Sequence, residues 1–321
     1  MKAAVYAHYG KPEVVQIKEV ELPGISATKV LIKIHATTVN RTDTALRAAD
    51  NLPTRLYAGV LAPKFSILGC EYSGTIVEIG EQVKQFAVGD KVFGFNGRNF
   101  GAHAEYIAVE ESSAIAHMPP MYSFDGAAAL TEGAHYALSN LRAAGVNEHK
   151  NILVYGATGA IGSAAVQLAK CLGASVTAVA AGIHSDLVKA LGADRFIDYK
   201  TEDFTKLDAR FDYIFDAVGK SSFSACKHLL SKGGIYSSTE LGKNAQNVIL
   251  AFAGNFSNGK KVIFPIPKID RGDAKYLSSL AQSGQFRPLI DRHYSLDDIC
   301  EAHRYVQSGQ KVGNVVIRVI S

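Results

Sequence analysis

Three glycines, Gly156, Gly159 and Gly162, have the spacing of a turn that binds phosphate. They follow a short apolar run at residues 152–155 and precede a segment with apolar residues at helical spacing. Glycine lets the backbone turn sharply, lets a pyrophosphate approach main-chain N–H groups and lets the helix pack close to the sheet. The unpaired N–H groups at a helix N-terminus favour an anion. We therefore predict a strand, a phosphate-binding turn and a helix, with an ordinary glycine turn as the alternative.

The composition permits a large core and favours a small-molecule partner. The chain has 321 residues, of which 47% are hydrophobic, and this length predicts two domains. The net charge of +4 comes from basic residues scattered among acidic ones. Neither a stripe for nucleic acid nor a polybasic membrane patch is apparent, so we expect no nucleic-acid or membrane partner.

The cysteines and the N-terminal residues bear on redox state and location. Cys70, Cys171, Cys226 and Cys300 lie far apart, without the spacing of a metal site, and we expect buried free thiols. The first residues indicate a strand rather than a signal segment, and no apolar run reaches membrane-spanning length. The expected location is cytoplasmic.

The first 120 or so residues have the pattern of a β-rich domain. Short apolar segments separated by glycine and proline turns predict a compact, partly closed β-barrel. A long connection at residues 38–66 has little periodicity, and connections of this kind often meet ligands. The predicted strands are residues 3–6, 30–34, 72–79, 91–95 and 104–109.

From Ser123 onward, helical and extended segments alternate. Residues 125–144 are alanine-rich and helical in character, although Gly133 interrupts them. Strands separated by helix-length segments predict a parallel sheet covered on both faces, which is a doubly wound α/β domain. The predicted strands are residues 152–155, 175–180, 195–199, 211–218, 234–238 and 262–264.

The C-terminal part returns to the first pattern. Residues 273–283 and 296–308 are predicted amphipathic helices, and residues 315–320 a final apolar strand. We expect this strand to join the first domain, so that the nucleotide-binding domain is an insertion. The predicted domains are residues 1–122 with 268–321, and residues 123–267.

A series of motifs in a fixed order resembles one protein family. The motifs are residues 68–74 (LGCEYSG), 86–94 (FAVGDKVFG), 101–107 (GAHAEYI), 156–162 (GATGAIG), 191–194 (LGAD) and 215–219 (FDAVG). Together they resemble the medium-chain dehydrogenase/reductase superfamily, in particular its zinc-free quinone oxidoreductase and enone reductase branch. The resemblance covers nearly the whole chain and implies a Rossmann domain inserted in a GroES-like domain.

The metal-binding motifs of the zinc-dependent relatives are missing. Those relatives have a cysteine in the first long loop and a Gly-His-Glu motif, whereas this chain has Asn40 to Asp43 without a thiol and then Gly69, Cys70 and Glu71. The four-cysteine zinc lobe is also missing from the sequence. We therefore expect no metal. No tyrosine has a lysine four residues later, which excludes the short-chain dehydrogenase pair.

The end of the second predicted strand bears on the choice of dinucleotide. An NAD site usually has a carboxylate there, but this strand runs into Ala181 and Gly182, and the next carboxylate is Asp186. We favour NADPH, with NADH as the alternative. Lys189 and Tyr199 by resemblance, and His184 by proximity, are candidate phosphate contacts, each with a purely structural alternative. The full set of expected cofactor-binding residues is Gly156, Ala157, Thr158, Gly159, Ala160, Ile161, Gly162, Ala181, His184, Lys189, Tyr199, Ala217, Val218, Gly219, Leu241 and Gly242.

Several side chains are candidates for the substrate cleft. By resemblance, Asn40 and Thr131 lie on the nicotinamide side, where Asn40 could bond an acceptor oxygen; the alternative for Thr131 is an internally bonded hydroxyl. Tyr57 either donates a proton or only lines the pocket. The remaining candidates are Asp43 and Glu71, which otherwise hold loop backbone, and Phe95 and Phe100; His103 is expected to be structural.

The missing metal also limits the chemistry. Without a Lewis acid, a simple carbonyl lacks stabilisation for a developing alkoxide, whereas a conjugated acceptor spreads the incoming charge. We therefore expect an NADPH-dependent reductase of quinones or α,β-unsaturated carbonyls, acting as a homodimer joined near residues 262–264. Two alternatives are a cofactor-binding redox sensor or structural module with little turnover, and a metal-dependent alcohol dehydrogenase.

Overall fold

The computed structural model describes residues 1–254 and 256–320, which form two compact units. The first unit comprises Met1–Glu132 and the chain from Ile269 onward, and the second comprises Gly133–Lys268. The first boundary thus lies after Glu132 rather than after residue 122. Ser321, the last residue of the predicted first domain, lies outside the described residues.

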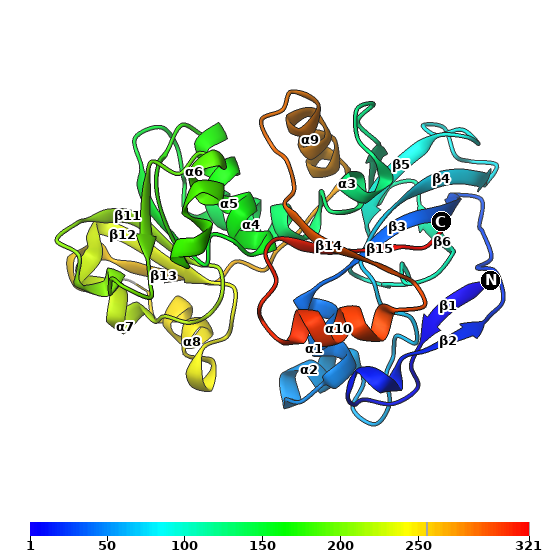
Figure 1. Cartoon of the computed structure of the whole chain (residues 1–321), viewed down its shortest axis with the longest axis horizontal. Helices are drawn as coiled ribbons and strands as arrows, with labels where there is room; N and C mark the ends of the chain where they lie inside the picture. The colour runs from blue at the N-terminus through cyan, green and yellow to red at the C-terminus, as the bar shows by residue number, and fades with distance from the viewer. Residues whose placement is uncertain (255, 321) are drawn as a thin grey trace. The chain divides into compact units, whose positions relative to one another are not determined.

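The second unit is built on a six-stranded parallel sheet (Figure 1). The strand order is β10-β9-β8-β11-β12-β13, and every neighbouring pair is parallel. This is the order of a doubly wound dinucleotide-binding fold, and it confirms the predicted fold class. The strands are β8 (Asn151–Tyr155), β9 (Ser175–Ala180), β10 (Arg195–Asp198), β11 (Phe211–Asp216), β12 (Leu230–Ser238) and β13 (Lys261–Ile263). The helices are α4 (Glu132–Ala143), whose first residue belongs to the first unit, α5 (Ala160–Cys171), α6 (Ser185–Ala190), α7 (Phe223–Cys226) and α8 (Gln246–Phe252).

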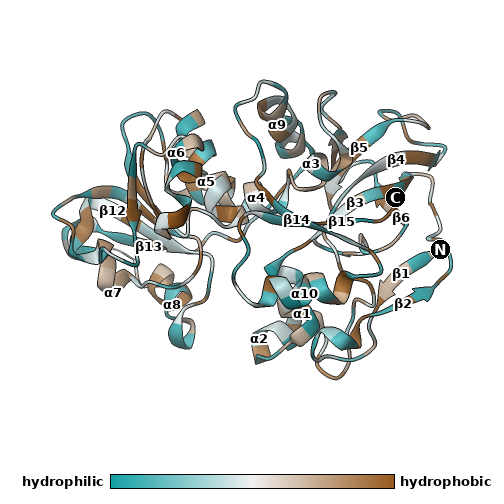
Figure 2. Cartoon of the chain, in the orientation of Figure 1, coloured by the Kyte–Doolittle hydropathy of each residue, from teal (hydrophilic) through white to brown (hydrophobic). Residues whose placement is uncertain are grey.

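Burial explains why these strands are almost continuously apolar. Ile152, Leu153 and Val154 are fully buried, because helices cover both faces of a parallel sheet. Figure 2 shows apolar residues gathered on the strands of this sheet. The apolar runs in the sequence therefore located the strands correctly.

The first unit contains a seven-stranded sheet and a separate two-stranded hairpin. The strand order is β14-β15-β3-β4-β5-β7, and β6 pairs with β3. The last strand, β15, runs antiparallel to β3, which confirms that the C-terminus returns to the first domain; Figure 1 shows it in red beside the blue β3. The strands are β1 (Lys2–Val5), β2 (Gln16–Glu19), β3 (Lys29–Val39), β4 (Glu71–Ile79), β5 (Lys91–Phe95), β6 (Tyr106–Glu110), β7 (Ala114–His117), β14 (Ile290–Ser295) and β15 (Asn314–Arg318). The helices are α1 (Arg41–Ala48), α2 (Leu52–Ala58), α3 (Phe124–Ala128), α9 (Arg271–Gln282) and α10 (Ile299–Gln307).

The structure adds detail to two segments that the sequence described only coarsely. The connection at residues 38–66 contains the helices α1 and α2, which are too short for a clear helical period. The alanine-rich segment breaks at residues 129–131, and Gly133 lies inside α4. A Cβ atom at Gly133 would lie 2.6 Å from the carbonyl oxygen of Ala160, so this glycine permits close packing rather than ending the helix.

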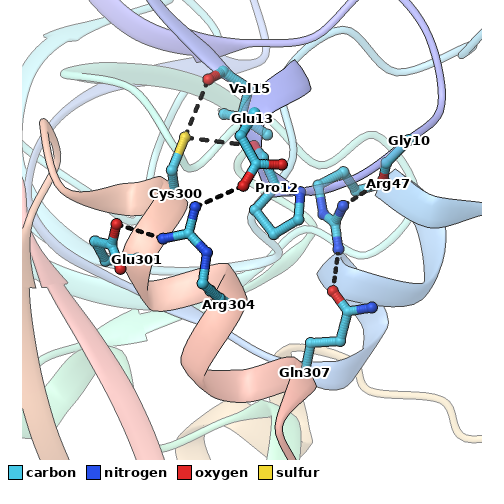
Figure 3. A network of polar contacts seen from close by, with 9 residues as sticks. All are labelled: Gly10, Pro12, Glu13, Val15, Arg47, Cys300, Glu301, Arg304 and Gln307. Carbon is cyan, nitrogen blue, oxygen red and sulfur yellow. Dashed lines mark hydrogen bonds and ion pairs between the residues drawn. The ribbon is translucent and has the colours of Figure 1, made fainter.

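Helix α10 is fastened to α1 and to the N-terminal segment by polar contacts (Figure 3). The buried guanidinium of Arg47 donates to the carbonyl oxygen of Gly10 and, at 2.7 Å, to Oε1 of Gln307. The thiol of Cys300 donates to the carbonyl oxygens of Pro12 and Val15 at 3.3 and 3.1 Å. These bonds hold α10 against α1 and against residues 10–15.

Candidate functional site

The glycine turn follows β8 in the second unit, and two of its glycines are required by the fold. Gly156 has a φ of 84°, and a Cβ atom there would lie 2.3 Å from Cγ1 of Val218. A Cβ atom at Gly162 would lie 2.1 Å from the carbonyl oxygen of Gly156. Both distances are far below van der Waals contact, so any side chain would force the turn apart.

Gly159 differs from the other two. It is the N-cap of α5, its φ of −70° suits any residue, and the nearest atom to an added Cβ would be 3.7 Å away. The space beside it is therefore open, at the N-terminus of a helix of twelve residues. Thr158, Ala160 and Ile161 complete this turn, and Ala157 is fully buried beneath it. The first N–H groups of a helix have no partner within it, and together with the helix dipole they suit a phosphate.

Asp216, at the carboxyl end of β11, holds the next loop in place. Its buried carboxylate accepts from the backbone N–H groups of Gly219 and Ser221, each at 2.8 Å, and from that of Val218 at 3.2 Å. The predicted cofactor residues Ala217, Val218 and Gly219 therefore lie in a turn organised by one carboxylate. The sequence motif FDAVG contains this residue, but we had not assigned its role.

The residues predicted to contact the adenosine end lie around the ends of β9 and β10. Ala181 follows β9, and His184 and Lys189 come from the helical segments after it, with Lys189 exposed. Tyr199 follows β10 and is 46% exposed. Its ring centroid lies 6.3 Å from that of Tyr155.

A carboxylate does lie at the end of β9, although it comes from another strand. Asp198 ends β10, and its Oδ2 atom would lie 2.3 Å from a Cβ atom added to Gly182. Asp198 follows β9 by eighteen residues and comes from the next strand, so the residues directly after β9 do not reveal it. An NAD site usually has its carboxylate at the end of the second strand itself, so Asp198 lies beside that position but on the neighbouring strand.

Leu241 and Gly242 lie in a loop after β12 that Asn247 holds. Gly242 has a φ of 73°, and Leu241 is 39% exposed. The buried side chain of Asn247 donates from Nδ2 to the carbonyl oxygen of Glu240 at 2.8 Å. The backbone N–H of Asn247 donates to the carbonyl oxygen of Leu241 at 3.0 Å. Asn247 therefore holds the backbone of residues 240 and 241 in place through two hydrogen bonds.

In the first unit, the carboxylate of Glu71 gathers two of the predicted catalytic residues. Its Oε1 accepts from both the N–H and the hydroxyl of Thr131, at 2.9 and 2.7 Å. Its Oε2 accepts from Nδ2 of Asn40 at 3.0 Å and from the hydroxyl of Thr38 at 2.6 Å. All four residues are buried. The Thr131 hydroxyl is thus bonded to a side chain distant in the sequence rather than to its own helix, and Glu71 also accepts from loop backbone.

Asp43, Cys70 and Glu132 lie beside this group and are also buried. Asp43 accepts from the N–H groups of Asn40 and Gly69 at 2.8 and 2.9 Å. Glu132 accepts from the Thr42 hydroxyl at 2.5 Å and from the Cys70 thiol at 2.9 Å. The sequence analysis missed Glu132, since a glutamate at a helix start usually needs no partner.

Burial controls the protonation of this cluster. Desolvation, followed by the nearby Asp43 and Glu71 carboxyls, raises the pKa of Glu132. Desolvation likewise raises the pKa of Asp43, against the hydrogen bonds that it accepts, and that of the Cys70 thiol. The cluster therefore keeps protons that exposed carboxyls would lose.

The donor set of this cluster suits a metal ion poorly. One ligand atom from each of Asp43, Cys70 and Glu132 lies within 4.8 Å of the others. However, both Asp43 oxygens accept backbone N–H groups, and the Cys70 thiol is the proton donor to Glu132. Cysteine binds zinc only as the thiolate, so a zinc ion here would remove the thiol proton and with it the Cys70–Glu132 hydrogen bond.

The remaining cleft candidates form an aromatic group. Tyr57 is 54% exposed and donates to the carbonyl oxygen of Gly97 at 3.3 Å. Its ring lies 5.9 Å from Phe65, which lies 4.8 Å from Phe100. Phe95 is half-buried nearby in β5.

His103 has the features of a structural residue. It is buried, and its Nε2 donates to the carbonyl oxygen of Thr38 at 2.9 Å. Burial lowers its pKa to about 4, so it is neutral at physiological pH.

Comparison with known proteins supports this combination of fold and motifs. Residues 26–120 match the alcohol dehydrogenase GroES-like domain, and residues 191–317 match the zinc-binding dehydrogenase family. A 2-methylene-furan-3-one reductase from Solanum lycopersicum is 34% identical over 100% of this chain and 79% of its own length. The chain belongs to the medium-chain dehydrogenase/reductase superfamily. It is thus an oxidoreductase.

Two further proteins place this member within the superfamily. An NADPH-dependent alkenal/one oxidoreductase, chloroplastic, from Arabidopsis thaliana is 30% identical over 99% of this chain and 79% of its own length. The structure of the quinone oxidoreductase from Coxiella burnetii has a TM-score of 0.89 and 27% identity, covering 100% of this chain and 99% of that one. Among the described residues, none of the helices has the length and apolar character to cross a bilayer.

Proposed function

We propose that this superfamily member is an NADPH-dependent, zinc-independent reductase of quinones or α,β-unsaturated carbonyls. The observation that carries the proposal is the turn at residues 156–162, with open space beside Gly159 at the start of α5. Relatives of this chain are named as reductases of a methylene furanone and of alkenals and enones, which are conjugated acceptors. The names of these two relatives, which are 34% and 30% identical to this chain, support this substrate class.

The dinucleotide supplies a hydride when bound, and the protein's own residues bind and orient the reactants. The N–H groups at the start of α5 are proposed to hold the phosphates, and the turn of residues 217–219 the adenosine ribose. Leu241 and Gly242 are proposed to lie near the nicotinamide. Each of these backbone segments is fixed by buried contacts, so little ordering is needed on binding.

For the substrate, Tyr57 with Phe65, Phe95 and Phe100 offers an apolar, aromatic surface suited to quinones and enones. Burial raises the pKa of the Tyr57 hydroxyl, so it is a weak acid, and solvent is the simpler proton source for an enolate. Because Glu71 already engages the Asn40 amide and the Thr131 hydroxyl, we propose that both act by positioning the loop backbone.

The deciding experiment is steady-state NADPH oxidation with naphthoquinones, phenanthrenequinone and short enones. Saturable turnover supports the reductase. Tight NADPH binding without turnover on any acceptor would instead favour the redox sensor or structural module. Zinc content by elemental analysis and activity after chelation test zinc independence, since a stoichiometric zinc whose removal abolishes activity would indicate a metal enzyme.

The preference for NADPH needs its own test because Asp198 opposes it. A carboxylate next to Gly182 repels a 2′-phosphate, whereas His184 and Lys189 attract it. Asp198→Asn should therefore strengthen NADPH binding relative to NADH, while His184→Ala and Lys189→Ala should weaken NADPH more than NADH. Equal effects on the two dinucleotides, measured by the fluorescence of the bound nicotinamide, would contradict the proposed phosphate contacts.

We also propose a cytoplasmic location and a homodimer. The Arabidopsis thaliana relative is named as chloroplastic, so fractionation of cells producing the full-length protein is the test of the first. Exposed apolar side chains beside the edge strand β13 support the second.

A further inference from the structure

A basic hollow lies in the second unit at the amino ends of β11, β12 and β13. Its volume is about 560 Å³, and four basic residues line it, Arg210, His228, Lys232 and Lys260, together with Ser231 and Asn258. Arg210 and Lys260 each directly precede a strand, and Lys232 is the third residue of β12. Because these strands are parallel, their amino ends lie together at the same end of the strands. The glycine turn follows the carboxyl end of β8 and so lies at the opposite end of these parallel strands.

The positive charges of this hollow are not neutralised by the protein. No acidic residue lines it, and within residues 1–254 and 256–320 no carboxylate pairs with Arg210, Lys232 or Lys260. Instead, Arg210 donates to the carbonyl oxygen of Ala209 at 2.9 Å, and Lys260 to that of Lys227 at 2.6 Å. His228 donates from Nε2 to the carbonyl oxygen of Thr205 at 2.6 Å. These carbonyl groups orient the three side chains and do not neutralise the charges of Arg210 and Lys260.

We propose that this hollow binds a small molecule with two or more negative charges, of the diphosphate or phosphate ester class. Guanidinium and ammonium groups form strong charge-assisted hydrogen bonds with phosphate oxygens, and Ser231 and Asn258 add neutral polar groups. The volume is within the range of small-molecule sites. No Phe, Tyr or Trp ring lines the hollow, so it lacks the large aromatic platform on which bases stack. Its apolar lining residue, Leu230, is itself buried, so neither a nucleic acid nor a membrane surface fits as well.

The test is calorimetric titration of the full-length protein with inorganic pyrophosphate while NADPH saturates its own site. We expect saturable binding of one pyrophosphate per chain, weakened at least about tenfold in Arg210→Gln/Lys260→Gln and more mildly in Lys232→Gln. Arg195→Gln is the matched control, because Arg195 also begins a strand of this sheet but pairs with Glu202 at 3.9 Å. It should leave the affinity within about twofold.

Three results would overturn the proposal. The first is unchanged pyrophosphate affinity in the double variant and in Lys232→Gln, with folding verified by circular dichroism. The second is loss of binding when NADPH is present, which would place pyrophosphate in the cofactor site. The third is a single-stranded oligonucleotide that binds more tightly through the same side chains, which would indicate a nucleic-acid surface. A titration of Gly159→Val should still show pyrophosphate binding, which keeps this result independent of NADPH binding.

Discussion

At the scale of single residues, the three glycines of the turn have different roles. Gly156 and Gly162 are needed so that the strand, the turn and the helix fit together. Gly159 is needed only if something occupies the space beside it, because its own backbone and surroundings accept a side chain. This difference separates cofactor binding from folding.

Gly159→Val should therefore remove nucleotide binding while the protein stays folded. The isopropyl group would occupy the open space in which we place a phosphate, so the dissociation constant for NADPH should rise at least about a hundredfold, or about 2.7 kcal/mol. Gly162→Val, in contrast, should destabilise the fold by about 3 kcal/mol through overpacking against Gly156. Fluorescence titration and thermal unfolding measure the two effects. Full NADPH affinity in a folded Gly159→Val protein would remove the proposed phosphate turn.

Glu132 gives a pH-dependent prediction at the same scale. Its pKa is raised in the folded protein, so folding takes up a proton between the ordinary pKa of 4.5 and the folded value of about 8. The contribution of this residue to stability is therefore complete below about pH 4.5 and is lost as the pH rises towards about 8. Glu132→Gln keeps the side-chain shape but does not ionise.

The measurement is urea unfolding of both proteins across this pH range. The stability of the wild type relative to Glu132→Gln should fall as the pH rises, whereas exposed Glu78→Gln in β4 serves as the control and should track the wild type. A constant difference between the wild type and Glu132→Gln would show that Glu132 keeps an ordinary pKa. Comparing each variant with the wild type at the same pH cancels the opposite trend from buried His103 and His303, whose lowered pKa values favour folding at higher pH.

At the scale of elements, the sequence located the parallel strands well and the polar elements poorly. Residues 152–154 and 176–180 are buried on both faces, so an apolar run was enough to find them. Strand β14 escaped prediction because its sequence, IDRHYS, has a mostly polar pattern with no buried residue. The Glu71 cluster escaped for a different reason, since it joins β4 to residues 38–43 and 131–132, and no local pattern encodes such long-range contacts. Asp198 was missed because it reaches the end of β9 from the neighbouring strand.

The packing of α10 depends on Arg47 more than on the exposed ion pairs around Arg304. Arg47 is fully buried and satisfies Gly10 and Gln307, whereas Arg304 pairs with Glu13 and Glu301 in water. Arg47→Ala should lower the free energy of unfolding by about 2–4 kcal/mol, because it removes the hydrogen bonds of a buried side chain and opens a cavity. Arg304→Gln should have a much smaller effect, because exposed pairs are screened. Chemical denaturation that ranked the two variants in the opposite order would contradict this account of α10.

At the scale of the whole molecule, the sheet of the second unit has two edges, β10 and β13, and the β13 side also carries apolar side chains that are exposed among the described residues. Strand β13 ends the sheet, and α8 packs beside it. Three large apolar side chains in this part of the chain are exposed, Ile249 (62%), Phe252 (86%) and Ile266 (78%). An isologous dimer would pair the β13 strands of two copies and bury these apolar side chains. Such burial would account for their exposure in the single chain.

We therefore expect the protein to run in multi-angle light scattering at twice its chain mass of 34.4 kDa. Phe252→Asp/Ile266→Asp should shift it to the monomer, because burying two carboxylates in an apolar interface is costly. Leu52→Asp/Leu56→Asp is the matched control, since these leucines of α2 are also about two-thirds exposed, at 66% and 67%, but lie in the first unit. A wild-type monomer would contradict the predicted dimer, and a dimer that survives the first double variant but separates in the second would place the interface away from β13. NADPH affinity should persist in the monomer, because the residues that we assign to the dinucleotide belong to a single unit.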